Sequence, residues 1–267
     1  MESPSDRPLA LVTGASRGIG FELAKQFAQN GFDLLVVAED VAIADAERAL
    51  QGAGGEVQAV RADLATKDGL DELYRRIDGA GRPLDAVALN AGIGAGGAFA
   101  TDTDLSDELK LIDLNVRSTV QIAKHVLREM AARGEGRVLF TSSIASSMPG
   151  SFQAVYNASK SFVQSFGLAL REELKDSGVT VTLLMPGPTE TEFFERADML
   201  DSRVGQADKD DPADVARDGF EALMAGKERV VSASLSTKLQ ARGSRLLPDK
   251  AKAKMHRRMA EPKSTDS

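Results

Sequence analysis

The chain has 267 residues, of which 42% are hydrophobic and 27% are charged, and its net charge is −7 at pH 7. This length and balance suit one α/β domain with a large core, and the acidic balance argues against general nucleic-acid binding. The chain has no cysteine, which excludes disulfides and thiol catalysis, and its two histidines are too few for a multi-histidine metal site, so no metal is expected.

Short apolar runs alternate with helical segments along the chain. The predicted strands are Leu9–Thr13, Asp33–Ala38, Glu56–Arg61, Leu84–Asn90, Arg137–Thr141, Val179–Met185 and Arg229–Ser232. The predicted helices are Gly18–Asn30, Val41–Ala53, Lys67–Asp78, Asp107–Arg133, Phe152–Ser177 and Pro212–Ala225. Uniformly apolar strands are buried on both faces, and repeated strand–helix–strand units build parallel sheets. The sequence therefore predicts a doubly wound parallel sheet of about seven strands with helices on both faces, and a ligand site beyond the carboxyl ends of its strands.

The domain boundaries follow from the same pattern. Residues 8–233 are expected to form one domain that holds both the cofactor and substrate sites, after a flexible N-terminus at residues 1–7. Residues 188–211 follow the sixth strand and are interpreted as a lid. No apolar stretch approaches the roughly 18 residues needed to span a bilayer, and residues 1–7 lack the apolar core of a signal peptide. A cytoplasmic protein is expected.

The C-terminal extension, residues 234–267, is predicted to be basic and helical. Residues 238–267 contain nine Lys or Arg and three Asp or Glu. Two interpretations stay open: a solvated helix packed on the domain, or weak peripheral contact with an anionic membrane or an acidic partner. The apolar face is small and the chain has no tryptophan, so stable membrane binding is not expected.

A glycine-rich turn joins the first predicted strand to the helix that follows. It reads Thr13-Gly14-Ala15-Ser16-Arg17-Gly18-Ile19-Gly20. Glycines let backbone N–H groups approach a diphosphate, and the helix N-terminus adds partial positive charge. The spacing differs from GxGxxG, and no Gly-Lys-Ser/Thr follows, so the turn is not a P-loop.

Polar and small residues also follow the third and fourth predicted strands. Asp63-Leu64 follows the third strand, where an Asp could bind an adenine amino group. Asn90-Ala91-Gly92 follows the fourth, where small residues let a flat ligand lie close to the backbone. Each alone could be a turn or a helix cap, but their shared position at strand ends indicates a dinucleotide site.

Four residues form the candidate catalytic group. Tyr156 and Lys160 are four apart in a predicted helix, so they share a face. A free tyrosine, with a pKa near 10, is a poor base at pH 7, but a nearby ammonium stabilises its phenolate. Ser143, thirteen residues before Tyr156, can donate a hydrogen bond to a substrate oxygen as it gains charge. Asn115 lies in the long predicted helix Asp107–Arg133.

Together these motifs resemble the classical short-chain dehydrogenase/reductase family, whose domain is of the Rossmann type. The resemblance covers roughly Leu9 to Val231, and includes PGPTET at 186–191. It implies that Tyr156 is the general acid/base, that Lys160 binds the nicotinamide ribose and lowers the tyrosine pKa, that Ser143 orients the substrate oxygen, and that Asn115 anchors a water in a proton relay.

The resemblance carries three further implications. Pro186, Gly187, Thr189 and Thr191 would contact the nicotinamide end of the cofactor. The protein would form a homodimer or homotetramer through the helices that hold Asn115 and Tyr156. The residues after Val231 look like those of the subgroup with a basic C-terminal extension.

Two features give opposing predictions for the cofactor. Glu39, at the end of the second strand, can accept hydrogen bonds from ribose hydroxyls, and it would repel a 2′-phosphate by up to about 4 kcal/mol near a protein surface. Arg17, inside the glycine turn, stands where NADP-using members of the family that it resembles often carry a basic residue. We expect NAD in preference to NADP, because the residue that ends the second strand usually decides.

The sequence thus predicts an oxidoreductase that moves a hydride between NAD(P) and a secondary alcohol or ketone. One alternative is a nucleotide-binding regulator that has lost its chemistry, although the four catalytic residues are all present. Another is an NADPH-dependent ketone or 3-oxoacyl reductase. The lid contains Phe193, Phe194, Met199 and Leu200, and two interpretations stay open: they line an apolar pocket, or they are packing that fastens the lid. On the first interpretation, the expected substrate is a hydrophobic small molecule.

Overall fold

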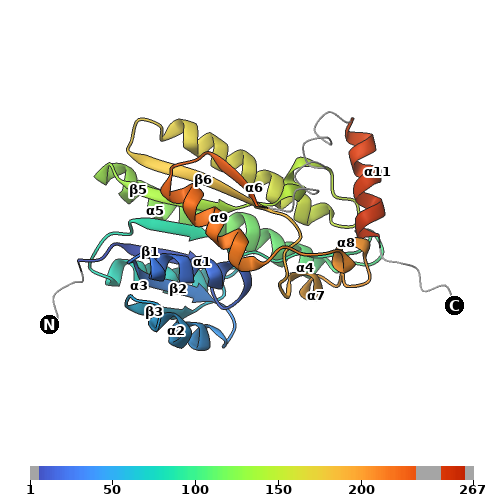
Figure 1. The fold of residues 1–267 in the computed structure, drawn as a ribbon. Coiled ribbons are helices and arrows are strands. Elements are labelled where there is room, and N and C mark those ends of the chain that lie inside the picture. The colour runs from blue at the N-terminus through green and yellow to red at the C-terminus, as the bar shows by residue number, and fades with distance from the viewer. Residues whose placement is uncertain (1–5, 233–247, 262–267) are drawn as a thin grey trace.

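The computed structural model describes residues 6–232 and 248–261, and a seven-stranded parallel sheet forms its centre (Figure 1). The strands are β1 (Leu9–Thr13), β2 (Asp33–Ala38), β3 (Val57–Arg61), β4 (Ala86–Leu89), β5 (Gly136–Thr141), β6 (Val179–Pro186) and β7 (Arg229–Ser232). They lie in the order β3-β2-β1-β4-β5-β6-β7, so the direction of winding reverses between β1 and β4. Ligands of such sheets bind in the crevice at this reversal. The predicted doubly wound sheet is confirmed.

Helices cover both faces of the sheet, which explains why its central strands are apolar throughout. One face carries α1 (Gly18–Gln29), α2 (Ile43–Gln51) and α9 (Pro212–Met224), and the other carries α3 (Lys67–Gly79), α5 (Thr119–Arg133) and α6 (Ala154–Glu173). Every residue of β1 and β2 is buried. The sheet is therefore a rigid base on which the loops at its carboxyl edge are mounted.

The long helix predicted over Asp107–Arg133 is interrupted in the structure. It begins as α4 (Leu105–Ile112), widens into the π-turn η1 (Asp113–Ser118) and continues as α5. Within η1 the hydroxyl of Ser118 donates to the carbonyl of Leu114, and the Thr119 hydroxyl donates to the carbonyl of Asn115, at 2.9 Å. Such side-chain bonds compete with the helical ladder, and π-turns concentrate at functional sites. Here the turn contains Asn115.

Short helices follow β5 and β6 at the carboxyl edge. They are η2 (Ile144–Ser147), α7 (Phe193–Arg196) and α8 (Arg203–Gln206), and α11 (Asp249–Ala260) lies next to α8 (Figure 1). The segment expected to be a lid, 188–211, contains α7 and α8. Its ends meet in a bridge between Thr189 and Asp210.

Parts of the expected terminal segments lie outside the described residues. These are residues 1–5 of the expected flexible N-terminus, and residues 233–247 and 262–267 in and next to the expected basic extension. Within the described ranges, no helix combines the length and apolar character that crossing a bilayer requires.

Candidate active site

A cleft of about 430 Å³ runs along the carboxyl edge of the sheet. It is lined by the glycine turn after β1, by the ends of β2, β3 and β4, and by the segments after β5 and β6. Each of these segments follows a strand, so the parallel sheet itself brings them to one edge. Among the described residues, no group of three or more potential metal ligands occurs.

The glycine turn leaves no space for side chains at its base. Gly14 and Gly18 have φ of +69° and +58°, a region that favours glycine. A Cβ on Gly14 would lie 2.9 Å from the Cα of Ala91, and one on Gly20 would lie 2.0 Å from the carbonyl oxygen of Gly14. The backbone is thus open toward the cleft at the start of α1, where helix N–H groups favour an anion. This geometry fits the diphosphate of a dinucleotide.

Asn90 ties the central strands together beneath the cleft. Its amide Nδ2 donates to the carbonyl of Thr13 at 3.2 Å, and its Oδ1 accepts from the hydroxyl of Thr141 at 3.1 Å. The Thr13 hydroxyl oxygen in turn accepts from the backbone N–H groups of Asn90 and Ala91, both at 2.9 Å. The predicted Asn90-Ala91-Gly92 turn therefore joins β1, β4 and β5 into one floor.

Ser143, Tyr156 and Lys160 line the same cleft as the glycine turn. Tyr156 and Lys160 project from the first turns of α6, and the Lys160 ammonium lies 5.9 Å from the centre of the Tyr156 ring. Lys160 Nζ also donates to the carbonyl of Thr141 at 3.1 Å. The Ser143 hydroxyl oxygen accepts from the N–H of Ala145 at 3.1 Å, which leaves its own proton to donate elsewhere.

Burial dominates the proton affinities of this cluster. It raises the pKa of Tyr156 to about 12, against a hydrogen bond with Ser143 that lowers it. It lowers the pKa of Lys160 to about 8. Desolvation thus holds the phenol of Tyr156 neutral, whereas Lys160 still carries its charge below about pH 8. A positive charge beside the phenol favours its ionisation.

Asn115 lies behind the cleft wall and does not line it. Its side chain accepts from the backbone N–H of Ile93 and donates to the carbonyl of Ile93, both at 2.9 Å. A Cβ on Gly92 would lie 3.1 Å from Asn115 Oδ1 and 3.1 Å from Lys160 Nζ. The π-turn therefore places Asn115 against the backbone at Gly92, which Lys160 also approaches.

Two carboxylates end β2 at the rim of the cleft. Glu39 pairs with Lys110 at 3.3 Å, and Asp40 accepts from the Ser16 hydroxyl at 2.9 Å. Asp40 also lies 3.7 Å from the guanidinium of Arg17 and 3.8 Å from that of Arg196. Negative charge at this rim is therefore balanced by cations from the glycine turn, from α4 and from the lid.

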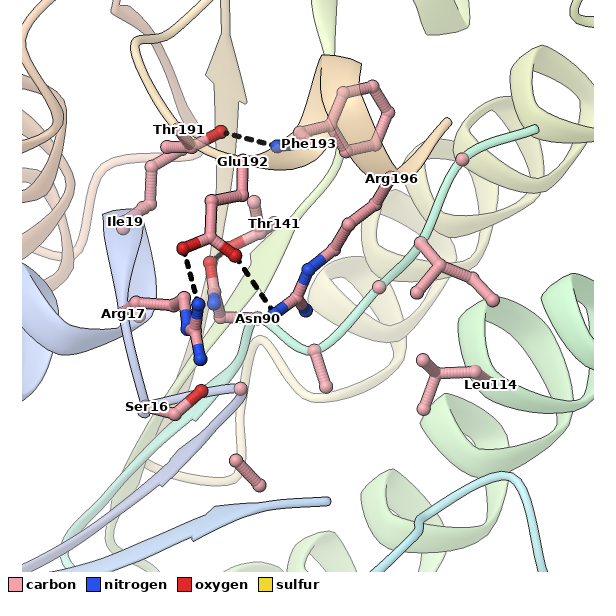
Figure 2. A pocket seen from close by; sticks show the side chains of 18 of the residues that line it. Ser16, Arg17, Ile19, Asn90, Leu114, Thr141, Thr191, Glu192, Phe193 and Arg196 are labelled. Carbon is pink, nitrogen blue, oxygen red and sulfur yellow. Dashed lines mark hydrogen bonds and ion pairs between the residues drawn. The ribbon is translucent and has the colours of Figure 1, made fainter. Parts of the chain in front are cut away.

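Charged side chains of the lid pair with one another and with the glycine turn at the rim of the cleft (Figure 2). Glu192 bonds to Arg17 of the glycine turn, and it pairs with Arg196 of α7 at 3.0 Å. The Phe193 ring lies 5.1 Å from that of Tyr156, and a Cβ on Gly94 would lie 2.5 Å from Phe193 Cζ. The lid thus contacts both the glycine turn and Tyr156.

The structure gathers nearly all of the sequence-predicted residues around this cleft. The lining includes Gly14, Ser16, Arg17, Gly18, Ile19, Gly20, Glu39, Asp63, Leu64, Asn90, Ala91, Gly92, Ser143, Tyr156, Lys160, Pro186, Thr189 and Thr191. Gly187 and Asn115 are not in the lining. Sequence reasoning missed the roles of Asp40, Glu192 and Arg196, because no local pattern shows that distant charges pair.

Comparison with known proteins finds relatives of this chain among the short-chain dehydrogenases. A family model described as short chain dehydrogenase matches residues 8–199. An uncharacterized short-chain type dehydrogenase/reductase of Sinorhizobium fredii is 36% identical over 189 residues, which cover 71% of this chain and 73% of that protein.

Solved structures of similar proteins contain bound dinucleotides. A short-chain dehydrogenase from Sphingobium yanoikuyae in complex with NADPH has a TM-score of 0.79 and 25% identity, and the match covers 97% of this chain and 99% of that one. A 3-oxoacyl-[acyl-carrier protein] reductase from Brucella melitensis in complex with NAD has a TM-score of 0.71 and 27% identity, covering 85% and 96%.

Proposed function

The chain belongs to the short-chain dehydrogenase family, and we propose that it transfers a hydride reversibly between NAD(P) and a secondary alcohol or ketone. The observation that carries the proposal is that Ser143, Tyr156 and Lys160 line the same cleft as the glycine turn. A dinucleotide whose diphosphate lies at that turn can then extend toward the phenol.

The residues around the cleft suit such a cofactor. The glycine turn, with Ser16 and Arg17, would bind the diphosphate and the adenosine ribose, and Asp63 and Leu64 would contact the adenine. Pro186, Gly187, Thr189 and Thr191 would contact the nicotinamide end. When bound, the nicotinamide supplies or accepts the hydride.

The cluster of Ser143, Tyr156 and Lys160 carries out proton transfer. Tyr156 donates its proton to the carbonyl oxygen during reduction and takes it back during oxidation. The Lys160 ammonium stabilises the resulting phenolate, and the Ser143 hydroxyl donates a hydrogen bond to the substrate oxygen. Asn115, which like Lys160 lies against Gly92, would anchor the water that reprotonates this cluster.

We favour NAD over NADP. Glu39 lines the rim and is 43% exposed, so its carboxylate is available to ribose hydroxyls despite its contact with Lys110. A 2′-phosphate would meet the negative charge of both Glu39 and Asp40. Arg17 argues for NADP, but Glu192 and Asp40 already neutralise much of its charge.

The proposed substrate is a hydrophobic carbonyl compound or alcohol. The cleft wall beside Tyr156 includes Ile93, Gly94, Phe193 and Phe194. A 3-oxoacyl reductase is the second candidate, because the Brucella melitensis relative is such an enzyme. Reduction of a 3-oxoacyl thioester, but not of simple ketones, would favour that candidate.

We also propose that the protein forms a homo-oligomer through α4 and α6. Leu105, Leu109 and Ile112 of α4 are exposed and are spaced so that they share one face, and Phe162 of α6 is exposed as well. Exposed apolar side chains in such a row mark protein contacts. Multi-angle light scattering should give a dimer or tetramer, and Leu109→Glu should shift it toward the monomer, whereas a wild-type monomer would contradict the proposal.

Replacement of Tyr156 by phenylalanine tests the proposed chemistry. Loss of the general acid/base is expected to lower turnover by about a thousandfold, within the usual range for such groups. Tyr74→Phe is the matched control, because Tyr74 stacks on His125 and does not line the cleft. Turnover is measured from nicotinamide absorbance with a panel of ketones, and NADH affinity is measured from NADH fluorescence.

Three results are decisive for this proposal. Tyr156→Phe should bind NADH with nearly wild-type affinity while losing turnover. Unchanged turnover would remove Tyr156 from the mechanism. Failure of the wild-type protein to bind either NADH or NADPH would overturn the oxidoreductase proposal, whereas dinucleotide binding without turnover of any substrate would favour a lapsed enzyme with a regulatory role.

A further inference from the structure

Helix α11 packs against the substrate side of the cleft. It contacts α8, and its buried Ala260 joins Phe194, Ala197 and Met199 of the lid in one apolar cluster. Phe152 and Phe193 pack against the same cluster. The exposed face of the helix is strongly basic, whereas its inner face packs against the lid.

A second set of contacts ties α11 to the segment that precedes the catalytic helix. The ring Nδ1 of His256 lies 2.9 Å from the carbonyl oxygen of Ser151, and the Ser151 hydroxyl donates to the carbonyl of Ala253 at 3.1 Å. His256 is buried, and burial lowers its pKa, so the neutral ring with a proton on Nδ1 donates this bond. These contacts clamp Ser151 from two positions on the helix.

The residue next to this clamp has a strained backbone. Phe152 has φ of +65°, which is a genuine outlier for a bulky side chain and is energetically unfavourable. Strain of this kind persists only where several contacts enforce it. Here the carbonyl of Phe152 accepts from the N–H of Gly97 at 3.0 Å, and the guanidinium of Arg257 lies 5.6 Å from its ring centre.

Both sets of contacts lead to the catalytic tyrosine. Phe152 lies four residues before Tyr156, just ahead of the first turn of α6. Phe193 packs on the cluster that includes Ala260 and lies against the Tyr156 ring and against Gly94. Movement of α11 would therefore displace the aromatic wall beside the phenol as well as the entry to α6.

We propose that α11 is a positioning element for substrate selection: His256 holds Ser151 and the strained Phe152, while Ala260 holds the lid, so that Phe193 stays against Tyr156. This inference rests on the proposed function and assigns a role to the C-terminal extension. The wall restricts the group attached to the carbonyl carbon to a compact apolar one. Release of α11 widens the site for bulkier ketones and leaves dinucleotide binding intact.

Hydrogen–deuterium exchange of the full chain tests the proposal without any substrate. In His256→Ala, exchange in peptides spanning residues 148–156 and 193–204 should become about fivefold to tenfold faster, as loss of a buried hydrogen bond permits. His256→Asn retains a side-chain N–H donor and should restore much of the protection. Arg258→Ala, on the exposed face of α11, is the matched control and should leave both peptides unchanged.

A milder variant keeps the test decisive if His256→Ala does not fold. Ser151→Ala removes only the hydroxyl that donates to Ala253, and it should accelerate exchange in the same two peptides. The NADH dissociation constant should stay within about twofold of wild type in every variant, because none of these residues lines the cleft. Unchanged exchange in Ser151→Ala and in folded His256→Ala would overturn the proposal.

Kinetics with two ketones test selection itself. In His256→Ala, the ratio of kcat/KM for butyrophenone to kcat/KM for acetophenone should rise about fivefold, and this rise should come from KM and not from kcat. In His256→Asn, the ratio should return toward the wild-type value. An unchanged ratio would contradict a role in selection. Absence of turnover with any ketone would count against the proposed function alone, because the exchange measurement needs no substrate.

Discussion

The nucleotide half and the substrate half of the cleft are built by different means. In the nucleotide half, backbone touches backbone: a Cβ on Gly14 would lie 2.9 Å from the Cα of Ala91. In the substrate half, the lid and α11 meet through side chains, as Ala260 does with Phe194 and Met199. Backbone contacts restrict residue type at each position, whereas side-chain packing admits many combinations. The first half is therefore predictable from motifs, and the second depends on the whole fold.

The strongest test of this contrast is Gly20→Ala. Its Cβ would lie 2.0 Å from the carbonyl oxygen of Gly14 and 2.6 Å from Asn90 Nδ2, so the floor of the cleft must deform. We expect the free energy of unfolding to fall by roughly 3 kcal/mol, as for other overpacked sites, and NADH affinity to fall more than tenfold. Chemical denaturation and NADH fluorescence measure the two effects.

A matched glycine elsewhere provides the control for that substitution. Gly79, at the end of α3, has nothing within 4 Å of an added Cβ, so Gly79→Ala should be neutral or stabilising by up to about 1 kcal/mol. Equal effects at Gly20 and Gly79 would show that the close backbone contacts of the nucleotide half do not restrict the residue type there.

The pH dependence of turnover tests the site where the two halves meet. Oxidation needs the Tyr156 phenolate, so its kcat/KM should rise with pH, whereas reduction needs the phenol and should fall as pH rises. Burial raises the pKa of Tyr156 to about 12 despite a hydrogen bond with Ser143 that lowers it. A nearby cation favours the ionised phenol, so the Lys160 ammonium is expected to oppose this rise. In Lys160→Met, the rise in the oxidation profile should therefore move to higher pH by about one unit or more.

Two further points sharpen that measurement. The pKa of Lys160 is about 8 in the buried cluster, so above that pH the lysine loses its charge and its support for the phenolate weakens. The wild-type oxidation profile should consequently flatten at high pH. Identical profiles in wild type and Lys160→Met would show that the lysine does not act on the proton affinity of the tyrosine.

The smallest expected effect lies at the rim. Glu39→Arg should shift the ratio of NADH to NADPH affinity by about fivefold toward NADPH, because the charge is reversed at a site that is screened by solvent. Glu173→Arg, an exposed position on α6, is the control for net charge. Parallel titrations with both cofactors measure the ratio, and an unchanged ratio would show that Glu39 does not select the cofactor.

The sheet and most of the lining could be predicted because their signals are local. Uniformly apolar strands, the turn from Gly14 to Gly20, and the four-residue spacing of Tyr156 and Lys160 each lie within a few residues. The π-turn could not be predicted in the same way. It depends on Asn115 reaching the backbone of Ile93, which is 22 residues away in sequence.

Contacts between residues far apart in the sequence could not be predicted from it. Arg17 and Glu192 are 175 residues apart, and His256 and Ser151 are 105 residues apart. In the sequence alone, each of these residues is typical of an ordinary solvent-exposed polar position. The basic composition of α11 predicts only a charged, solvated face, whereas the two residues that fasten the helix are the neutral His256 and Ala260.

The close contact between the glycine turn and Asn90-Ala91 has a practical consequence for anyone diversifying this enzyme. Gly14, Gly20 and Asn90 form one interlocked unit, so a randomised library at these codons would consist mainly of inactive clones. Codons for the lid and for the inner face of α11 offer the opposite prospect. Recombining those segments between relatives would change substrate range while the nucleotide floor is inherited unchanged.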